Sequence, residues 1–468
     1  MTYKPNYKIT LGLAPTRRDG FPSPKDAFEN KKRIMPELLK ILRQIPDLEI
    51  VDIEWLNEEG LLVDPMDVPR VVEHFKHHKV DAIFMPHCNY GSEEVVGMLG
   101  KAMGKPFLLW GPRDVEPPKG YVNRYTDTQC GLFGSSAALI RYGVPFTYIE
   151  NCWIDSPTLS AGLERFVRAA TVIKTFHNLR IGQICQRPKP FLCVMYNESE
   201  MLSKFGIEVV PISDAEYTRT AQSILNQNSQ EIHNIVSRIK AENDCHTMEE
   251  EKLEAIAALE LSFIRLAEKY GCTAMASECW EVYGTRFGIE PCSAFGDLND
   301  YGLPTACEAD IHGAVSLALA MAASRGETPG FLADLTNRHP FNENAELLWH
   351  CGPFPRSLAK EDAKPSIIRC QSQFEIKGGD ITLVRFGSLR DGEYRLFADE
   401  AVGVEGPPTK GNYGWVETEN WPRWERKFIY GPYVHHIIGI HGKYASALHE
   451  ACRYIDGLKA DSVREYEI

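Results

Sequence analysis

The first third of the chain alternates short apolar runs with segments whose apolar positions recur at helical spacing. The apolar runs lie at residues 7–15, 48–55, 80–88, 105–112 and 144–150. Short apolar strands that are separated by amphipathic helices are typical of parallel βαβ units. The pattern therefore predicts a first α/β domain over residues 1–175.

A second alternating region follows, and we expect it to form a central α/β domain over residues 176–355. Residues 179–186, 190–198 and 207–213 have the composition of strands. The clearest helix of the chain spans residues 247–271, where apolar residues recur every three or four positions and Gly271 supplies a stop signal. Thr247 and Glu250 have the spacing of an N-terminal capping box.

The pattern changes after about residue 355. Strand-like segments at 380–389, 393–406 and 426–442 are separated by glycine-rich turns, and helical periodicity returns only at 444–458. This region predicts a smaller, mostly β domain over residues 356–468. The expected fold is thus two Rossmann-like or flavodoxin-like parallel-sheet domains followed by a mostly β domain.

The amino-acid composition disfavours some classes of binding partner and indicates a cellular compartment. The 468 residues carry 64 acidic and 51 basic side chains, a net charge of −13, which disfavours nucleic acid as a partner. No apolar run reaches the roughly 18 residues of a membrane span, and the N-terminus lacks the apolar core of a signal peptide. The 13 cysteines are scattered without a CxxC pair, and the loose group Cys272, Cys279, Cys292 and Cys307 matches no zinc motif. We expect reduced thiols in a cytoplasmic protein with no membrane partner.

Three carboxylates follow predicted strands of the central domain. Glu278 comes directly after the apolar segment 272–277, and Glu308 and Asp310 precede an apolar run that begins near residue 314. Ligands of open α/β sheets gather at the carboxyl ends of strands. If residues 308–310 are extended, both of their carboxylates point to the same side. Each acid alone could cap a helix, but together they favour a paired-carboxylate site for a metal or for acid–base work.

Histidines provide the second half of a candidate site. His435 and His436 lie in an apolar, strand-like stretch, where an extended chain turns them to opposite sides, so at most one faces a given pocket. A buried imidazole needs a partner, and a metal is one candidate. His350 is followed by Cys351, but adjacent residues do not normally form a nucleophile–base pair, so His350 remains a pocket candidate.

Polar and aromatic residues also follow the predicted strands of the first domain. Arginine and asparagine supply directed hydrogen bonds and tryptophan a flat apolar face, which suits a small polyhydroxylated ligand. Gly131 and Gly134 could cradle an anion in front of a helix, although no GxGxxG motif is present. The candidate substrate-binding residues here are Arg17, Arg18, Cys88, Asn89, Tyr90 and Trp110.

The order of five motifs resembles the L-fucose isomerase family, which is grouped with the L-arabinose isomerases. The motifs are PTRRDG, MPHCNYGSEE, LLWG, ACEADIHGA with GETPGFLADL, and a late HH. The resemblance implies three domains and aldose–ketose isomerisation with Mn²⁺ or another divalent cation. It further implies that Glu278, Asp310 and His436 bind the metal, with His435 as the alternative histidine, and that Glu278 and Asp310 exchange protons with the sugar.

The resemblance also implies a homo-oligomer, a trimer or hexamer with sites at subunit contacts. The strand-end loops of the first domain would then contact the sugar from an adjacent subunit, and Glu308, His350 and His435 would be further substrate contacts. This chain is shorter than the fucose enzymes, which leaves the sugar open. A 6-deoxy aldose or one substituted at C6 fits, including an anionic sulfo-sugar.

Two carboxylates and a divalent cation suit proton transfer between C1 and C2 through an enediol. A hydride shift is the mechanistic alternative. Two other functions stay open at this point: a non-catalytic sugar-binding protein, and a metal-dependent aldolase or lyase that acts on a sugar phosphate.

Overall fold

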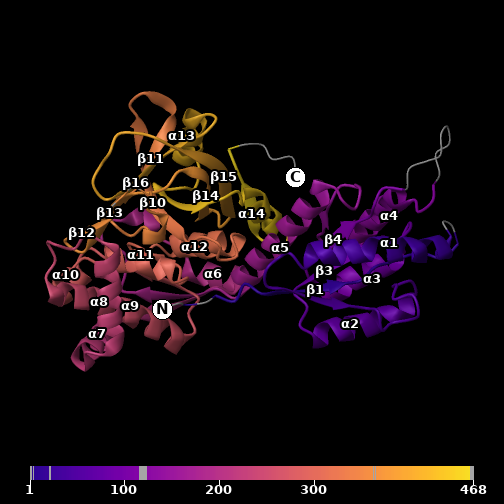
Figure 1. Cartoon of the computed structure of the whole chain (residues 1–468), viewed down its shortest axis with the longest axis horizontal. Helices are drawn as coiled ribbons and strands as arrows, with labels where there is room; N and C mark the ends of the chain where they lie inside the picture. The colour runs from indigo at the N-terminus through magenta and orange to yellow at the C-terminus, as the bar shows by residue number, and fades with distance from the viewer. Residues whose placement is uncertain are drawn as a thin grey trace. The chain divides into compact units, whose positions relative to one another are not determined.

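The structure is a computed structural model that describes residues 3, 5–20, 23–114, 124–361, 363 and 365–463. The chain divides into two compact units, one of residues Tyr7–Lys174 and one of Met1–Asn6 with Thr175–Ile468 (Figure 1). Each unit has its own hydrophobic core. The long helix α5 (Pro157–His177) leads from one unit into the other.

The N-terminal unit contains a five-stranded parallel sheet in the order β2-β1-β3-β4-β5. Apolar clusters cover both faces of the sheet, as burial on two sides requires. The chain order reverses direction between β1 and β3, the type of switch point at which α/β sheets bind ligands. The elements are β1 (Ile9–Leu13), α1 (Pro24–Leu42), β2 (Leu48–Asp52), a 3₁₀ turn (Pro65–Asp67), α2 (Val68–His77), β3 (Ala82–Pro86), α3 (Glu93–Met103), β4 (Phe107–Trp110), α4 (Thr128–Tyr142) and β5 (Thr147–Tyr148).

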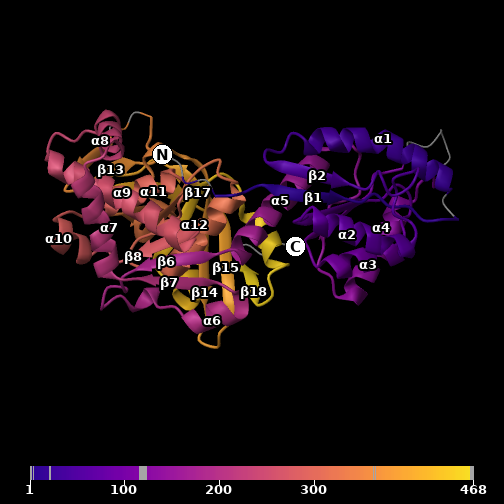
Figure 2. The same cartoon turned by 90° about the horizontal axis from the view of Figure 1, so that it is seen from below.

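A second parallel sheet begins the larger unit, in the order β7-β6-β8-β9. Figure 2 shows β6, β7 and β8 side by side. The strands are β6 (Arg180–Ile184), β7 (Glu208–Ile212), β8 (Ala274–Ser277) and β9 (Thr305–Ala306). The helices are α6 (Glu198–Phe205), α7 (Asp214–Gln227), α8 (Gln230–Glu242), α9 (Glu250–Tyr270), α10 (Val282–Phe287), α11 (Cys292–Asp300) and α12 (Ile311–Ala323).

Six antiparallel strands of the larger unit close into a barrel, in the order β16-β11-β10-β17-β14-β15 with β15 pairing back onto β16. Closure leaves these strands without a free edge. The elements are β10 (Gly330–His339), β11 (Asn342–His350), a 3₁₀ turn (Arg356–Leu358), β12 (Ser366–Ile368), β13 (Gln371–Glu375), β14 (Gly379–Ser388), β15 (Tyr394–Val404), β16 (Asn412–Glu417), α13 (Trp421–Tyr430), β17 (His436–His441), α14 (Ala445–Cys452) and β18 (Leu458–Asp461).

Helix α12 joins the small parallel sheet to the barrel. It contacts β8 and β9 on the sheet and β10, β14 and β17 on the barrel, and all of its residues are buried. A helix that is covered on every side must be apolar around its whole circumference, which explains the apolar run after Asp310. No helix in the described ranges is long and apolar enough to cross a membrane.

The expected fold class is confirmed: two parallel-sheet α/β regions are followed by a mostly β region. The division at residues 175 and 355 stays a prediction. Residues 7–174 do form one compact unit, whereas the barrel takes β10 and β11 from residues that precede 355.

Three local predictions were wrong. Residues 190–198 are not a strand but contain a 3₁₀ turn at Leu192–Val194, because Pro188 and Pro190 deprive this segment of ladder donors. Residues 426–430 end helix α13, whose buried Trp421, Trp424 and Phe428 recur at helical spacing. Helix α9 starts at Glu250 with Glu249 as its N-cap and without a side-chain cap, so Thr247 forms no capping box.

Candidate active site

The imidazole of His436 lies between two carboxylates. His436 is the first residue of β17 and is fully buried. Its Nδ1 is 2.7 Å from Oδ2 of Asp310, and its Nε2 is 2.8 Å from Oε2 of Glu308. The barrel and the carboxyl end of the parallel sheet therefore meet at this histidine.

An unusual backbone turn brings the two carboxylates to opposite sides of the same ring. Glu308 and Ala309 have positive φ angles of 58° and 54°. Residues 308–310 are therefore not extended, and the condition under which both carboxylates would point to the same side is not met. Asp310 instead becomes the N-cap of α12 and accepts the Gly313 N–H at 2.8 Å. Left-handed conformations cost free energy for residues with a Cβ, and such strain concentrates at functional sites.

A buried guanidinium holds Asp310 in place. Arg385 of β14 donates to both oxygens of Asp310, at 2.6 and 3.2 Å, and both side chains are almost fully buried. Burial alone would raise the pKa of Asp310, but the charges of Arg385 and His436 and their hydrogen bonds lower it below its ordinary value. Asp310 is thus a fixed anion with four donors directed at it.

A second histidine and a third acid complete the group. His350 ends β11, and Asp334 on β10 is the register partner of His436 on β17. Nε2 of His350 and Oδ1 of Asp334 are buried and have no hydrogen-bond partner among the described residues. The potential ligand atoms of Glu308, His350 and His436 lie within 4.8 Å of one another, and so do those of Asp334, His435 and His436.

The charge of this group favours a cation. Glu308, Asp310 and Asp334 supply three carboxylates, which the guanidinium of Arg385 alone does not balance. Burial alone would lower the pKa of His350, but the neighbouring Cys351 and the acidic surroundings raise it to about 10. Burial alone would lower the pKa of His436, but its hydrogen bonds to Asp310 and Glu308 raise it. Because the same field that attracts a proton attracts a metal ion, the residues present fit a divalent cation with mixed imidazole and carboxylate ligands.

Glu278 lies directly after β8 but has other partners. Its carboxylate accepts the backbone N–H groups of Trp280, Glu281 and Val282 at 2.6, 3.1 and 3.2 Å, and so caps the start of α10. It belongs to neither of the two ligand groups found among the described residues. Trp280 nevertheless links the two sites, because its indole N–H donates to Oε1 of Glu308 at 2.8 Å.

Aromatic side chains lie beside the two histidines, and the sequence patterns did not predict them. Trp280 is 52% exposed, and its ring centroid is 5.5 Å from that of Phe191, which is in turn 5.4 Å from that of His435. The rings of His435 and His436 are 4.6 Å apart. The prediction that they face opposite sides was wrong, because β17 begins only at His436 and His435 lies outside the strand alternation.

A cavity of about 610 Å³ adjoins Ala309 at the carboxyl ends of β6 and β7. Its lining includes Gln183, Arg187, Tyr196 and Ser213. Arg187 donates to the carbonyl oxygens of Pro188 and Lys189 and has no carboxylate partner among the described residues. The cavity therefore offers the cationic side chain of Arg187 and several hydroxyl and amide groups, together with the carboxylate of Glu198. It adjoins the site at Ala309, which lies between Glu308 and Asp310 in sequence.

Comparisons with known proteins show which enzymes this chain is similar to. A family model described as "Fucose/sulfoquinovose isomerase, N-terminal domain" matches residues 12–177. Proteins named sulfoquinovose isomerase are 24% identical in Priestia aryabhattai, over 78% of this chain and 85% of the relative, and 25% identical in Alkalicoccus urumqiensis, over 69% and 73%. The chain is therefore similar to the fucose/sulfoquinovose isomerases, through the family model over residues 12–177 and through these relatives over more than two thirds of its length.

The fucose isomerase model covers the N-terminal unit, where four of the six predicted contact residues gather at one edge of the sheet. Arg18 donates its backbone N–H to the Asn89 side chain at 3.0 Å, and its guanidinium lies 3.5 Å from the centroid of the Tyr90 ring. Arg17 pairs with Asp19 and Glu59.

The other two predicted contact residues of this unit, Cys88 and Trp110, are fully buried. Trp110 directs its indole N–H at the Cys152 thiol, 3.4 Å away. This placement favours packing over substrate contact for both residues.

Gly131 and Gly134 lie inside α4 rather than in front of it, so the predicted anion cradle is wrong. A Cβ on Gly131 would sit 1.6 Å from the carbonyl oxygen of Tyr90. The glycine is needed there because α4 passes directly over the loop that carries Asn89 and Tyr90.

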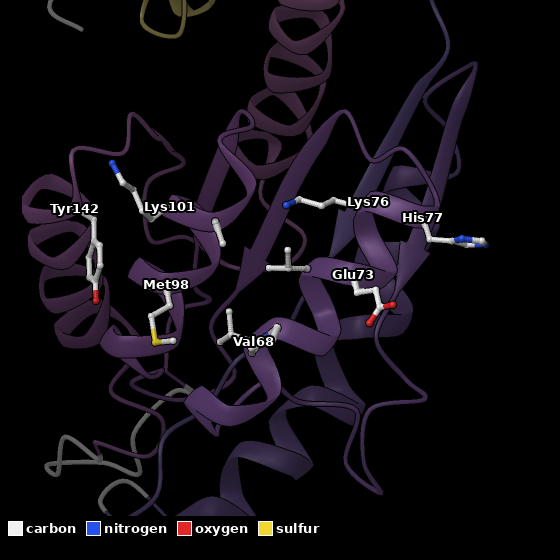
Figure 3. A pocket seen from close by; sticks show the side chains of 10 residues that line it. Val68, Glu73, Lys76, His77, Met98, Lys101 and Tyr142 are labelled. Atoms are coloured by element: carbon white, nitrogen blue, oxygen red, sulfur yellow. The ribbon is translucent and has the colours of Figure 1, made fainter.

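A separate cavity of about 840 Å³ lies along α2, α3 and α4 of the same unit. Figure 3 shows Met98 and Tyr142 on one side of it and Val68 and Lys76 on the other. None of the residues predicted to bind substrate lines this cavity.

Proposed function

We propose that the protein is a metal-dependent aldose–ketose isomerase whose substrate is a sulfo-sugar, an aldose with an anionic substituent at C6. The observation that carries the proposal is the convergence of Glu308, His350 and His436, whose ligand atoms lie within 4.8 Å of one another. The names of the relatives, which are sulfoquinovose isomerases, support the reaction class and the anionic substituent. They disfavour the sugar-binding and aldolase alternatives.

Glu308, His350 and His436 would hold the cation, and Mn²⁺ suits their oxygen and nitrogen donors. The cation would supply polarisation of the sugar carbonyl. Asp310 accepts a hydrogen bond from Nδ1 of His436, which directs Nε2 toward Glu308 and the ligand group. Carboxylates that orient a ligating imidazole in this way raise its basicity.

Proton exchange requires carboxylates that reach C1 and C2 of the sugar. Asp310 was predicted for this role, but its buried ion pair with Arg385 and its lowered pKa leave it little capacity to take a proton. We assign it an orienting role. Glu308 and the predicted Glu278, which lie on either side of Trp280, are the proposed proton-exchanging groups.

Arg187 is the proposed partner of the anionic substituent. It lines the cavity beside Ala309, and guanidinium groups bind tetrahedral oxyanions through paired N–H donors. The exposed face of Trp280 would pack against the carbon skeleton of the sugar. Arg17, Arg18, Asn89 and Tyr90 would complete the site from an adjacent subunit of a homo-oligomer, as the family resemblance implies.

The test is turnover of matched aldoses with Mn²⁺, with the C6 substituent either sulfonate or hydroxyl. We expect ketose formation, a preference for the sulfonate of at least about tenfold in kcat/KM, and loss of this preference in Arg187→Met, since a charge-assisted hydrogen bond contributes about 1.5–3 kcal/mol. Products of C–C cleavage, or no product from either sugar, would contradict the proposal.

The same reaction in D₂O distinguishes the two mechanisms. Solvent deuterium at C1 or C2 of the product is expected if the Glu278 and Glu308 carboxylates exchange protons through an enediol. Complete absence of deuterium would indicate a hydride shift.

A further inference from the structure

Four thiols from four separate segments gather beside the candidate site, where the sulfur of Cys351 lies 3.2 Å from Nδ1 of His350. Cys279 follows β8, Cys292 opens α11, Cys307 follows β9 and Cys351 follows β11. The sulfur atoms of Cys279 and Cys307 are 3.1 Å apart, and those of Cys292 and Cys351 are 3.3 Å apart. All four are free thiols. In each pair the sulfur atoms are thus in contact, although the two cysteines are 28 positions apart in sequence in the first pair and 59 in the second.

In the pair Cys279–Cys307, one cysteine is accessible from solvent and the other is buried. Cys279 is partly exposed, whereas Cys307 is 1% exposed. Their strands β8 and β9 are neighbours that pair Met275 with Thr305 and Ala276 with Ala306, which holds the two backbones close. Contraction from 3.1 Å to a disulfide bond of about 2.05 Å needs a movement of about 1 Å.

Each cysteine of this pair is the direct sequence neighbour of a residue of the candidate site. Cys307 precedes Glu308, whose left-handed backbone sets the direction of its carboxylate. Cys279 lies between Glu278 and Trp280, and Trp280 donates to both Glu278 and Glu308. A change in the sulfur positions therefore acts on the carboxylates directly through the chain.

We propose that Cys279 and Cys307 form a thiol modification site that a small hydroperoxide oxidises to a disulfide, and that the disulfide displaces Glu308 and reduces turnover. The sulfur of Cys279 attacks the peroxide and breaks its O–O bond, which yields a sulfenic acid and water or an alcohol. The sulfur of Cys307 then attacks the sulfenic sulfur, the S–S bond forms and the second oxygen leaves as water.

Atoms and electrons balance over these two steps. The two thiols lose two electrons and two protons, and the peroxide gains both and is reduced. A dithiol reverses the change by thiol–disulfide exchange. A hydroperoxide is the fitting oxidant because only a small molecule reaches the partly buried Cys279 beside a fully buried partner.

The formation of the cross-link is independent of the proposed function, whereas its effect on turnover rests on it. Hydrogen peroxide is therefore added to the full chain, and free thiols, cross-linked peptides and isomerase activity are measured together. We expect two of the 13 thiols to be lost, a peptide joined through Cys279 and Cys307, and at least a fivefold loss of activity that dithiothreitol restores. Cys307→Ser should form no such cross-link, and peroxide should leave it with the activity that the variant had before treatment, because the disulfide that displaces Glu308 cannot form.

Cys130→Ser is the matched control, because Cys130 is exposed and lies in the N-terminal unit; it should behave like the parent chain. Oxidation of Cys130 without a Cys279–Cys307 cross-link would overturn the proposal, and so would a cross-link between Cys292 and Cys351 in its place. A Cys279–Cys307 cross-link with unchanged turnover would overturn the regulatory half. A chain that shows the cross-link but has no isomerase activity before oxidation would contradict the proposed function and leave the thiol site standing.

Discussion

Removal of the Arg385 guanidinium should destabilise the protein far more than removal of an exposed arginine. Arg385 and Asp310 are 2% and 0% exposed, and two hydrogen bonds of 2.6 and 3.2 Å join them. Breaking a buried ion pair by deletion of one partner costs about 3–5 kcal/mol, because the remaining charge stays buried without compensation. We therefore expect Arg385→Met to lower the free energy of unfolding by about 3–5 kcal/mol.

The assay is urea denaturation followed by circular dichroism. Arg265→Met is the matched control: Arg265 pairs with Glu231 at 39% and 53% side-chain exposure, where such pairs contribute about 0–1 kcal/mol. The double variant Arg385→Met with Asp310→Asn should recover at least about 1 kcal/mol of the loss, because it removes the unpaired charge. A loss for Arg385→Met no greater than that of the control, or a double variant less stable than the single one, would refute the reasoning.

Two further predictions concern the acid and the tryptophan of the site. The pKa of Asp310 lies below its ordinary value of 3.8, so its stabilising contribution is present above about pH 4 and is lost as the pH falls. The stability difference between the parent chain and Asp310→Asn should shrink in acid titrations of unfolding, and a difference that stays constant from pH 7 to pH 3 would argue against a charged Asp310. Trp280→Ala should raise KM at least about fivefold, since a lost aromatic face costs about 1–3 kcal/mol. Trp280→Phe should restore KM but retain a lower kcat, because the N–H to Glu308 is missing; equal kinetics for both variants would exclude this division of roles.

Much of the architecture could be read from periodicity because its strands and helices are strongly patterned. The apolar runs at 80–88 and 105–112 became β3 and β4, and the stripe at 247–271 became α9. The errors arose where packing against distant parts of the chain, and not the local sequence pattern, decided the secondary structure. Residues 426–430 are apolar enough for a strand, yet the spacing of Trp421, Trp424 and Phe428 lets one helical face cover the barrel.

The candidate site was predictable in its polar residues and unpredictable in its geometry. Glu308, Asp310, His350 and His436 were identified as candidates from their neighbours in sequence, and the structure brings them together. No periodicity predicts two consecutive left-handed residues at Glu308 and Ala309, which place the two acids on opposite sides of one ring.

The partners Arg385 and Asp334 lie in ordinary strand sequence of the barrel. Only the register that pairs Asp334 with His436, and the approach of β14 to α12, reveal their roles. Register between distant strands is a tertiary property that a single sequence does not display.

The metal content of purified variants tests the central claim most directly. After equilibration with Mn²⁺ and removal of the free ion, elemental analysis should find about one cation per chain in the parent protein. It should find strongly reduced content in Glu308→Gln, His350→Asn and His436→Asn, and unchanged content in the control His449→Asn, which alters a buried histidine of α14. Full metal content in Glu308→Gln and His350→Asn, or none in the parent chain, would contradict the account.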